Sequence, residues 1–423
     1  MERSSPEPVI DTAKFARGAR LYVSNKNKVM AMTPIPRLRA HSGSALLSYG
    51  FRPFFLFGAC YAALAILAWL PLFYGELALP TAFAPRDWHV HEMLYGYIPA
   101  VVTGFLLTAI PNWTGRLPLQ GGSLLILVIA WAAGRSAVTL SAEIGWLAAA
   151  LIDSSFLLLV VAATAREIIA GRNWGNLKVL IPVTILGLGN AAFHVEAHVF
   201  GAADYGIRVG IAGILVLIMV IGGRLIPSFT RNWLARENPG RLPVPFGRFD
   251  AAVIALSSAA LAVWIVEPFS HATAAGLVAA GLLQTMRLAR WAGDRTLRDR
   301  LVIVLHVAYA FVPLGFVLTG LSAIGVIVPS AGLHAWMVGA AGMMTLAVMT
   351  RATLGHTGHE LIATVQTQLI YAAVFIAAIA RICAALEPRW SELELHVAAF
   401  AWAAAFLGFG IVFSPMLWGL RKN

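Results

Sequence analysis

The sequence predicts an all-α, polytopic membrane protein with twelve transmembrane helices. Its 423 residues are 59% hydrophobic and only 12% charged, whereas charged residues make up about 25% of an average soluble domain. The mean hydropathy is +0.77. Apolar runs also recur along the chain at the length of about 20 residues that a membrane-spanning helix needs. These three observations exclude a soluble multidomain protein.

Twelve apolar segments are expected to form the transmembrane helices. A window of about 19 residues places them at 54–75, 93–111, 121–141, 144–165, 177–200, 207–227, 250–267, 271–290, 301–326, 332–350, 361–386 and 396–419. Residues 46–423 are therefore expected to form one twelve-helix transmembrane domain. Residues 1–45 are polar and basic, without the apolar core of a signal peptide. We expect them to form a disordered cytoplasmic tail, and Met30 or Met32 is an alternative start.

The basic residues sort to one side of this predicted topology. Four of them lie on the side opposite the termini: Arg86, Arg208, Arg381 and Arg389. Arg135 lies inside a span, so 26 of the 31 lysines and arginines share a side with both termini. The positive-inside rule then predicts that both termini are cytoplasmic. The net charge of +11 is therefore attributed to topology, with no nucleic-acid partner expected, and the arginine runs at 231–248 and 287–300 are interpreted as ordinary cytoplasmic loops.

The second, sixth and tenth spans share a pattern. Each begins with a polar residue that is followed five positions later by glycine: His91 and Gly96, Arg208 and Gly213, His334 and Gly339. Their ends are also related, reading IPNWTGR, IPSFTRNWL and MTRATLGHTG. The pattern suggests three repeats of four helices, although small residues are common in membrane helices for packing reasons alone.

Five histidines are expected at the outer ends of their spans: His89, His91, His194, His198 and His334. His194 and His198 are four residues apart and share a helix face, so they could bind one metal ion or two adjacent centres. His89 and His91 are two apart and would diverge on a helix, so His89 is expected in the preceding loop. A single histidine at a membrane boundary is more often an interfacial residue than a ligand.

Three carboxylates lie near these histidines or within a span: Glu92, Glu196 and Asp153. Carboxylates inside a membrane are costly and usually functional. We expect them to feed protons to a nearby metal centre. Cys60 and Cys383 are the only cysteines and form no CxxC motif, so a thiolate metal site is not expected.

Neutral imidazole binds haem iron, copper and zinc. Several histidines from different helices at one depth suit a haem held by axial imidazole, with or without a copper beside it. Arg135 and Arg208 are candidates for pairing with haem propionates. Spacing alone does not separate haem from copper.

Five sequence blocks carry a resemblance to a known family: SYGFRPFFL (48–56), WHVHEMLYG (88–96), GFLLTAIPNWTGR (104–116), GGRLIPSFTRNWL (222–234) and TLAVMTRATLGHTG (345–358). With these blocks the chain resembles the NnrS family over most of its length after residue 45. The resemblance implies a multi-pass protein of the bacterial cytoplasmic (inner) membrane that contains haem, expected to be haem b, and copper. It also implies a role in the response to nitric oxide.

Carried over by block, the family's histidines fall here on His89, His91, His194, His306, His334 and His356. The resemblance does not say which of them binds which metal. We expect the outer cluster, including His198, to form the main centre. The set around His306 and His356, near the cytoplasmic side, is expected to hold a second haem.

The expected function is the binding and reduction of nitric oxide to nitrous oxide in defence against nitrosative stress. This makes the chain a nitric oxide reductase-type oxidoreductase in the lipid bilayer, with a quinol or a cytochrome as electron donor. Two alternatives stay open at this point. One is a copper or haem transporter, and the other is a non-catalytic nitric oxide sink or sensor.

Overall fold

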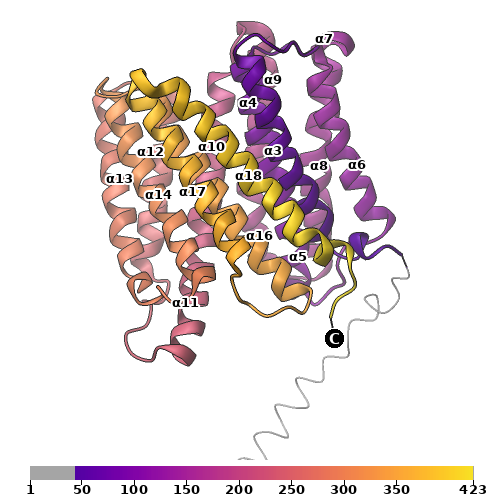
Figure 1. The fold of residues 1–423 in the computed structure, drawn as a ribbon, viewed down its shortest axis with the longest axis vertical. Coiled ribbons are helices and arrows are strands. Elements are labelled where there is room, and N and C mark those ends of the chain that lie inside the picture. Colours follow the sequence, from indigo (N-terminus) through magenta and orange to yellow (C-terminus); the bar gives the residue numbers. More distant parts are fainter. Residues whose placement is uncertain (1–42, 423) are drawn as a thin grey trace, which may run out of the picture. The chain divides into compact units, whose positions relative to one another are not determined.

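The computed structural model describes residues 43–422, and these residues form helices and connecting loops without any β-strand (Figure 1). The prediction of an all-α fold is therefore confirmed. The predicted tail at 1–45 lies almost wholly outside the described residues and stays a prediction. Among the described residues, the short η1 (Ala45–Leu47) precedes the first long helix.

Twelve helical spans of the described chain are long and apolar enough to cross a bilayer, as predicted. In order they are α3 (Phe51–Phe73); α4 (Pro85–His91), η2 (Glu92–Tyr97) and α5 (Ile98–Thr114); α6 (Gly122–Thr139); α8 (Trp146–Ala170); η3 (Trp174–Val179) and α9 (Leu180–Phe200); α10 (Asp204–Leu217), η4 (Ile218–Gly222) and α11 (Gly223–Glu237); α12 (Arg248–Val266); α13 (His271–Ala289); α14 (Arg300–Ala323); α15 (Pro329–His334), η6 (Ala335–Gly342) and α16 (Met343–His356); α17 (Val365–Leu386); and η7 (Pro388–Trp390) with α18 (Ser391–Trp418). The short α7 (Ser141–Ile144) and η5 (Gly293–Arg295) lie between spans.

Helical structure extends beyond the apolar cores that the sequence identifies. The second span begins at Pro85, because proline suits the first position of a helix, where its missing N–H is not needed. His89 is therefore inside α4, and the expectation that it lies in a loop is wrong. The divergence expected on a helix does occur, since His89 and His91 face different neighbours, as described below.

The second, sixth and tenth spans are each interrupted by a π-helical segment, namely η2, η4 and η6. Side chains donate hydrogen bonds to carbonyl groups within these segments. Trp131 Nε1 donates to Gly96 O at 2.9 Å, and Arg287 donates to Met219 O at 3.0 Å. π-Helical turns are rare and often mark functional sites. The three repeats stay a prediction. A π-helical segment at a similar place in the second, sixth and tenth spans agrees with it.

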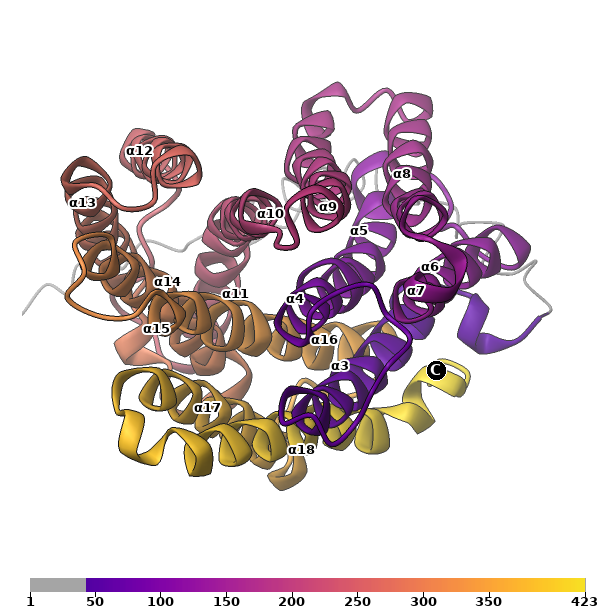
Figure 2. The ribbon, with the colours of Figure 1, turned by 90° about the horizontal axis from the view of Figure 1, so that it is seen from above.

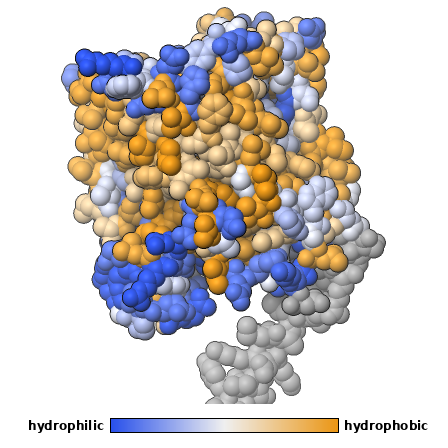
Figure 3. Space-filling model, viewed as in Figure 1, coloured by the Kyte–Doolittle hydropathy of each residue, from blue (hydrophilic) through white to orange (hydrophobic). Residues whose placement is uncertain are grey.

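The spans differ in how far they are enclosed by protein. The most apolar stretch of the second span is 83% buried, whereas that of α12 is 28% buried. Seen from above, α4, α11 and α16 lie toward the middle, and α6, α12 and α13 lie at the periphery (Figure 2). Many apolar side chains are exposed, among them those of Leu158 and Ile411. Figure 3 shows an apolar band between two more polar ends. This band is the surface that a multi-pass protein presents to lipid.

The two ends of the bundle are named here by their helices. The α4 end carries the start of α4 and the short α7, at the top of Figure 1. The α11 end carries α11 and the chain's C-terminus, at the bottom of the same view. The predicted cytoplasmic position of the termini would make the α11 end cytoplasmic.

Candidate metal centre

Three side chains near the α4 end bring potential metal ligands together. His91 from α4, Asp153 from α8 and His194 from α9 each offer one ligand atom, and these atoms lie within 4.8 Å of one another. All three residues are buried, with exposed fractions of at most 2%. Two imidazoles and a carboxylate form a donor set that suits copper or zinc.

Asp153 contacts more of the surrounding polar side chains than its two partners in this group. Its Oδ2 accepts hydrogen bonds from Asn190 Nδ2 at 2.7 Å and from His194 Nε2 at 3.0 Å. Its other oxygen pairs with the guanidinium of Arg135. Asn190 precedes His194 by one helical turn on α9, so both side chains reach Asp153 from the same helix face. Asn190 was not predicted as a site residue. Its position four residues before His194 was the feature of the sequence that could have indicated it.

Glu92 places a second carboxylate beside the first. Its Oε1 lies 3.1 Å from His91 Nδ1, and its Oε2 accepts from Arg135 at 2.8 Å and from the hydroxyl of Tyr61. Glu92 is the first residue of the π-helical η2, and Gly96 follows in the same segment. A Cβ at Gly96 would lie 2.6 Å from Arg135, so glycine gives the guanidinium its space.

The hydrogen-bond pattern around His91 fixes the charge balance of the site. Nδ1 faces Glu92 Oε1, and Nε2 lies 2.9 Å from Asn190 Oδ1 and 3.2 Å from Asp153 Oδ2. Both ring nitrogens therefore face acceptor oxygens, which is the pattern of a ring that donates from both. A His91 ring that carries a proton on both nitrogens is positively charged. The two negative charges of Glu92 and Asp153 are then balanced by the positive charges of His91 and Arg135. A singly charged metal ion in place of the proton would keep this balance.

Aromatic rings close the group from one side. The ring of Phe83 lies 5.5 Å from those of His91 and His194, and the ring of Phe193 lies 5.0 Å from that of His91. Gly206 allows this packing, because a Cβ there would lie 2.7 Å from the backbone of Phe193. The close approach of α10 to α9 thus supports the helix that carries His194.

Three residues predicted for the site have other partners in the structure. His198 stacks on Trp146, with ring centroids 4.2 Å apart. Glu196 accepts from the backbone N–H groups of Tyr205 and Gly206, near the beginning of α10. Arg208 donates to Ile265 O at 3.0 Å and stacks over the ring of Tyr205. These contacts give each side chain a structural role, and their predicted functional roles stay predictions.

His89 and His334 lie together outside the group of His91, Asp153 and His194. Both line two small cavities, of about 110 and 40 Å³, and Arg381 lines the smaller one. His89 stacks on Trp69, and its buried Nδ1 has no hydrogen-bond partner in the described structure. His334 Nδ1 donates to Ser330 O at 2.6 Å, which leaves Nε2 free to accept or to bind a metal.

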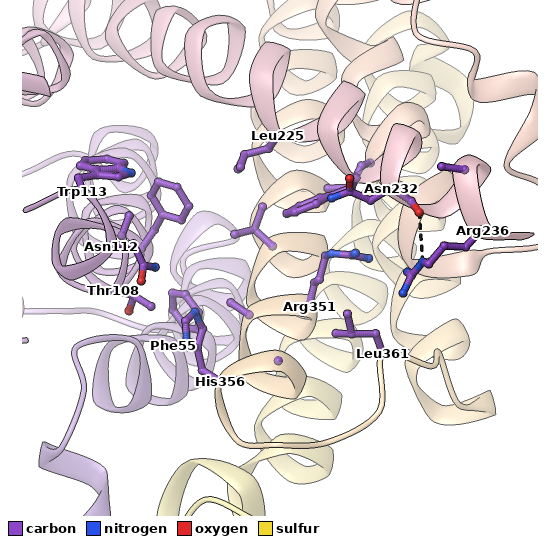
Figure 4. Close-up of a pocket in the computed structure, with 18 residues that line it drawn as sticks. Phe55, Thr108, Asn112, Trp113, Leu225, Asn232, Arg236, Arg351, His356 and Leu361 are labelled. Atoms are coloured by element: carbon purple, nitrogen blue, oxygen red, sulfur yellow. Dashed lines mark hydrogen bonds between the residues drawn. The ribbon is translucent and has the colours of Figure 1, made fainter. Parts of the chain in front are cut away.

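The largest of the described cavities, of about 870 Å³, lies at the α11 end and is called the α11-end cavity (Figure 4). Its walls include Phe55, Trp113 and Phe229, and its polar side chains include Arg351 and His356. Arg236 also lines it and was not predicted as a site residue. His306 is not among the lining residues; its Nε2 lies 2.8 Å from the hydroxyl of Thr230.

The α11-end cavity fits a large planar cofactor better than the small cavities at His89 and His334. Its volume is within the range of about 300–1,000 Å³ that is typical of cofactor pockets. The ring of His356 packs against Tyr49 and Phe51, which would hold it in place as an axial ligand. The guanidiniums of Arg236 and Arg351 could pair with acidic groups.

Comparison with models of protein families identifies the family of this chain. The model described as NnrS protein matches residues 45–421. The chain belongs to the NnrS family. Membership suggests a membrane protein of the nitric oxide response, in a family associated with metal and haem binding, and the buried His–Asp–His group could bind a metal. No curated protein matches the chain.

Proposed function

We propose that this NnrS protein binds copper and haem and reduces nitric oxide to nitrous oxide. The buried group of His91, Asp153 and His194 is the observation that carries the proposal, because a dry set of two imidazoles and a carboxylate serves a metal ion. With a membrane quinol as reductant, two molecules of nitric oxide and one quinol give nitrous oxide, water and quinone. The quinol supplies both electrons and both protons.

The metal would be held by His91, His194 and Asp153, and it would supply an electron and a binding position for nitric oxide. The chain supplies the rest. Glu92 Oε1, 3.1 Å from His91 Nδ1, is placed to accept a proton from the ring and to return it. Arg135 holds Glu92 and Asp153 in position. The rings of Phe83 and Phe193 keep bulk water from the site.

A haem would be held in the α11-end cavity by His356, Arg236 and Arg351. It would supply a second redox centre between the quinol and the copper. The aromatic walls of the cavity support this assignment, since Phe55, Phe105 and Phe229 could pack against the porphyrin faces. This placement develops the expectation that His356 belongs to a second haem site.

Purified protein in detergent tests the proposal. Its optical spectrum, its copper content and its consumption of nitric oxide with reduced quinol are measured, with nitrous oxide as the product. Formation of one nitrous oxide per two nitric oxide molecules is expected from the balance above. Protein that binds nitric oxide without forming nitrous oxide would contradict the reductase and identify a sink.

Replacement of His194 by alanine is expected to remove bound copper. The ring is one of three donors, and even the loss of a supporting contact lowers metal affinity about 10–100-fold. Copper is measured by mass spectrometry on folded protein after size-exclusion chromatography. His198→Ala is the matched control, one turn further on α9 and stacked on Trp146. Equal copper in the two variants would refute the assignment of His194.

Replacement of His356 by alanine is expected to remove or shift the haem absorption band. The ring lines the α11-end cavity and would be the axial ligand. His359→Ala is the control, because His359 lies three residues further and is held by the hydroxyl of Thr357. An unchanged spectrum in His356→Ala would exclude this haem position, and the copper assignment would be unaffected.

A further inference from the structure

Three cavities follow one another along the interface of the second, sixth and tenth spans. The first, called the α4-end cavity, has about 110 Å³ and is lined by His89, His334 and residues of all three spans. The second, called the middle cavity, has about 90 Å³. The third is the α11-end cavity of about 870 Å³. All three cavities are thus lined by residues of the same three spans.

Neighbouring cavities share wall residues, so they follow one another directly. Ile98 lines both the α4-end and the middle cavity. Phe105, Leu225, Leu305 and Val348 line both the middle and the α11-end cavity. The cavities are therefore adjacent to one another.

Each span contributes one continuous stripe of its surface. On the second span, Leu94, Ile98, Val101, Phe105 and Ala109 follow one another at intervals of three or four residues. The tenth span repeats this with residues 334, 338, 341, 345, 348 and 352, and the sixth with residues 207, 211, 214, 218, 221, 225 and 229. Such intervals define a single helix face. The same face of each span therefore lines the whole series.

The middle cavity excludes polar molecules by its walls. Thr345 is the one residue with a polar side chain among those that line it. Its hydroxyl is already bonded, to Ala341 O at 2.8 Å and Gly342 O at 2.7 Å. Cavities lined by hydrocarbon stay dry but bind small apolar molecules such as xenon. Water, ions and sugars would find no partners in this cavity.

We propose that these cavities form an apolar passage for small uncharged molecules of the size of a dissolved diatomic gas. The passage runs between His89 and His334 at one end and His356 at the other. Gases partition into the bilayer, so they can reach the interior of the protein without a polar pore. At one end the passage would reach the proposed haem site at His356. The proposal of a passage rests on the residues that line the three cavities. It does not depend on whether the protein reduces nitric oxide.

Xenon tests the passage without any bound cofactor. Protein with ¹³C-labelled isoleucine methyl groups is titrated with xenon in nanodiscs, and the methyl shifts are followed by NMR. The methyl groups of Ile98, Ile214 and Ile221, which line the middle cavity, are expected to shift and to saturate. That of Ile411, which is 73% exposed on the apolar surface, should change only in proportion to the xenon dissolved in lipid.

Val348→Phe is expected to fill the boundary between the middle and α11-end cavities, and to remove the xenon shifts of Ile214 and Ile221. Val263→Phe makes the same change at a side chain that is 45% exposed on α12, and it should leave these shifts intact. Shifts at Ile214 and Ile221 that never saturate, or that persist unchanged in Val348→Phe, would overturn the proposal.

Gly222→Ala provides a milder variant in case Val348→Phe does not fold. Gly222 lines the middle cavity, and a Cβ there would lie 3.7 Å from Tyr309, at ordinary contact distance. The added methyl group should therefore be tolerated. It should weaken xenon binding at Ile221, and unchanged affinity in this folded variant would also count against the passage.

Discussion

Replacement of Arg135 by methionine is expected to remove most of the folded protein from the membrane. Arg135 is 5% exposed and contacts both Glu92 and Asp153. Methionine keeps much of the volume but leaves two carboxylates with His91 as their one cationic partner. Removal of one partner of a buried ion pair costs about 3–5 kcal/mol, which is a large part of the stability of most proteins.

The charge balance around Arg135 provides a direct control. The double variant Arg135→Met with Asp153→Asn removes one charge of each sign, so it should recover folded protein relative to Arg135→Met alone. It should not recover bound copper, because Asp153 is a proposed ligand. Fluorescence-detected size-exclusion chromatography and thermal unfolding measure the first effect, and metal analysis measures the second. Equal unfolding temperatures for the single and the double variant would refute the electrostatic explanation.

Arg208→Met serves as a comparison at a basic residue outside the candidate metal centre. Arg208 is only partly buried, donates to one backbone carbonyl and stacks on Tyr205. Its replacement leaves no carboxylate unpaired. We expect a loss of stability near the value of about 1 kcal/mol that is typical of one hydrogen bond.

The class of fold could be predicted from the sequence because the signal is local. A run of about 20 apolar residues predicts a membrane helix whatever surrounds it. Helix direction and spacing also indicated that His91 and His194 lie near the same end of the bundle, and Asp153 was singled out as an intramembrane carboxylate. These three residues do come together within 4.8 Å.

Spacing predicts that His89 and His91 diverge on a helix, but it does not predict which neighbours each of them meets. His89 and His91 are two residues apart on α4, so one faces Trp69 and the other faces Asp153. The π-helical segment that begins at Glu92 changes the helix phase beyond it. Asn190 shares α9 with His194, so its spacing carried a signal, whereas Tyr61 reaches Glu92 from α3 and only the tertiary packing shows this contact.

The interpretation of Arg287 as an ordinary loop residue is wrong. It lies near the end of α13 with an exposed fraction of 0%. Its Nε donates to Asp250 at 3.0 Å, and its Nη1 donates to the hydroxyl of Tyr309 at 2.8 Å. A hydropathy window places such a residue at a span boundary, where most arginines face water. The partner carboxylate is 37 positions away in the sequence, so no local pattern indicates the pair.

Arg287→Met is expected to destabilise the protein about as strongly as Arg135→Met. The lost contacts lie in a different part of the fold, between α13 and α12. The change leaves the buried Asp250 with Arg290, at 3.9 Å, as its remaining ion-pair partner among the described residues. It also removes a donor from Met219 O in the π-helical η4. The cost is expected to be about 3–5 kcal/mol, measured by thermal unfolding in detergent.

Arg290→Met is the matched control for Arg287→Met. Both arginines approach the same carboxylate of Asp250, but the side chain of Arg290 is 34% exposed and lies at the longer distance. An exposed ion pair contributes about 0–1 kcal/mol, so this variant should unfold close to the original temperature. Similar losses in both variants would show that burial of the pair is not what makes it important.

The copper content of the variants is expected to differ between the network around Arg135 and the network around Arg287. Asp250, Tyr309 and Gln284, which surround Arg287, belong to α12, α14 and α13, and none of them contributes to the group of His91, Asp153 and His194. The double variant Arg287→Met with Asp250→Asn should therefore restore folding and keep its copper. The corresponding double variant at Arg135 and Asp153 should fold without copper. If both restored proteins lacked copper, the metal would depend on the whole bundle and the local assignment at Asp153 would fail.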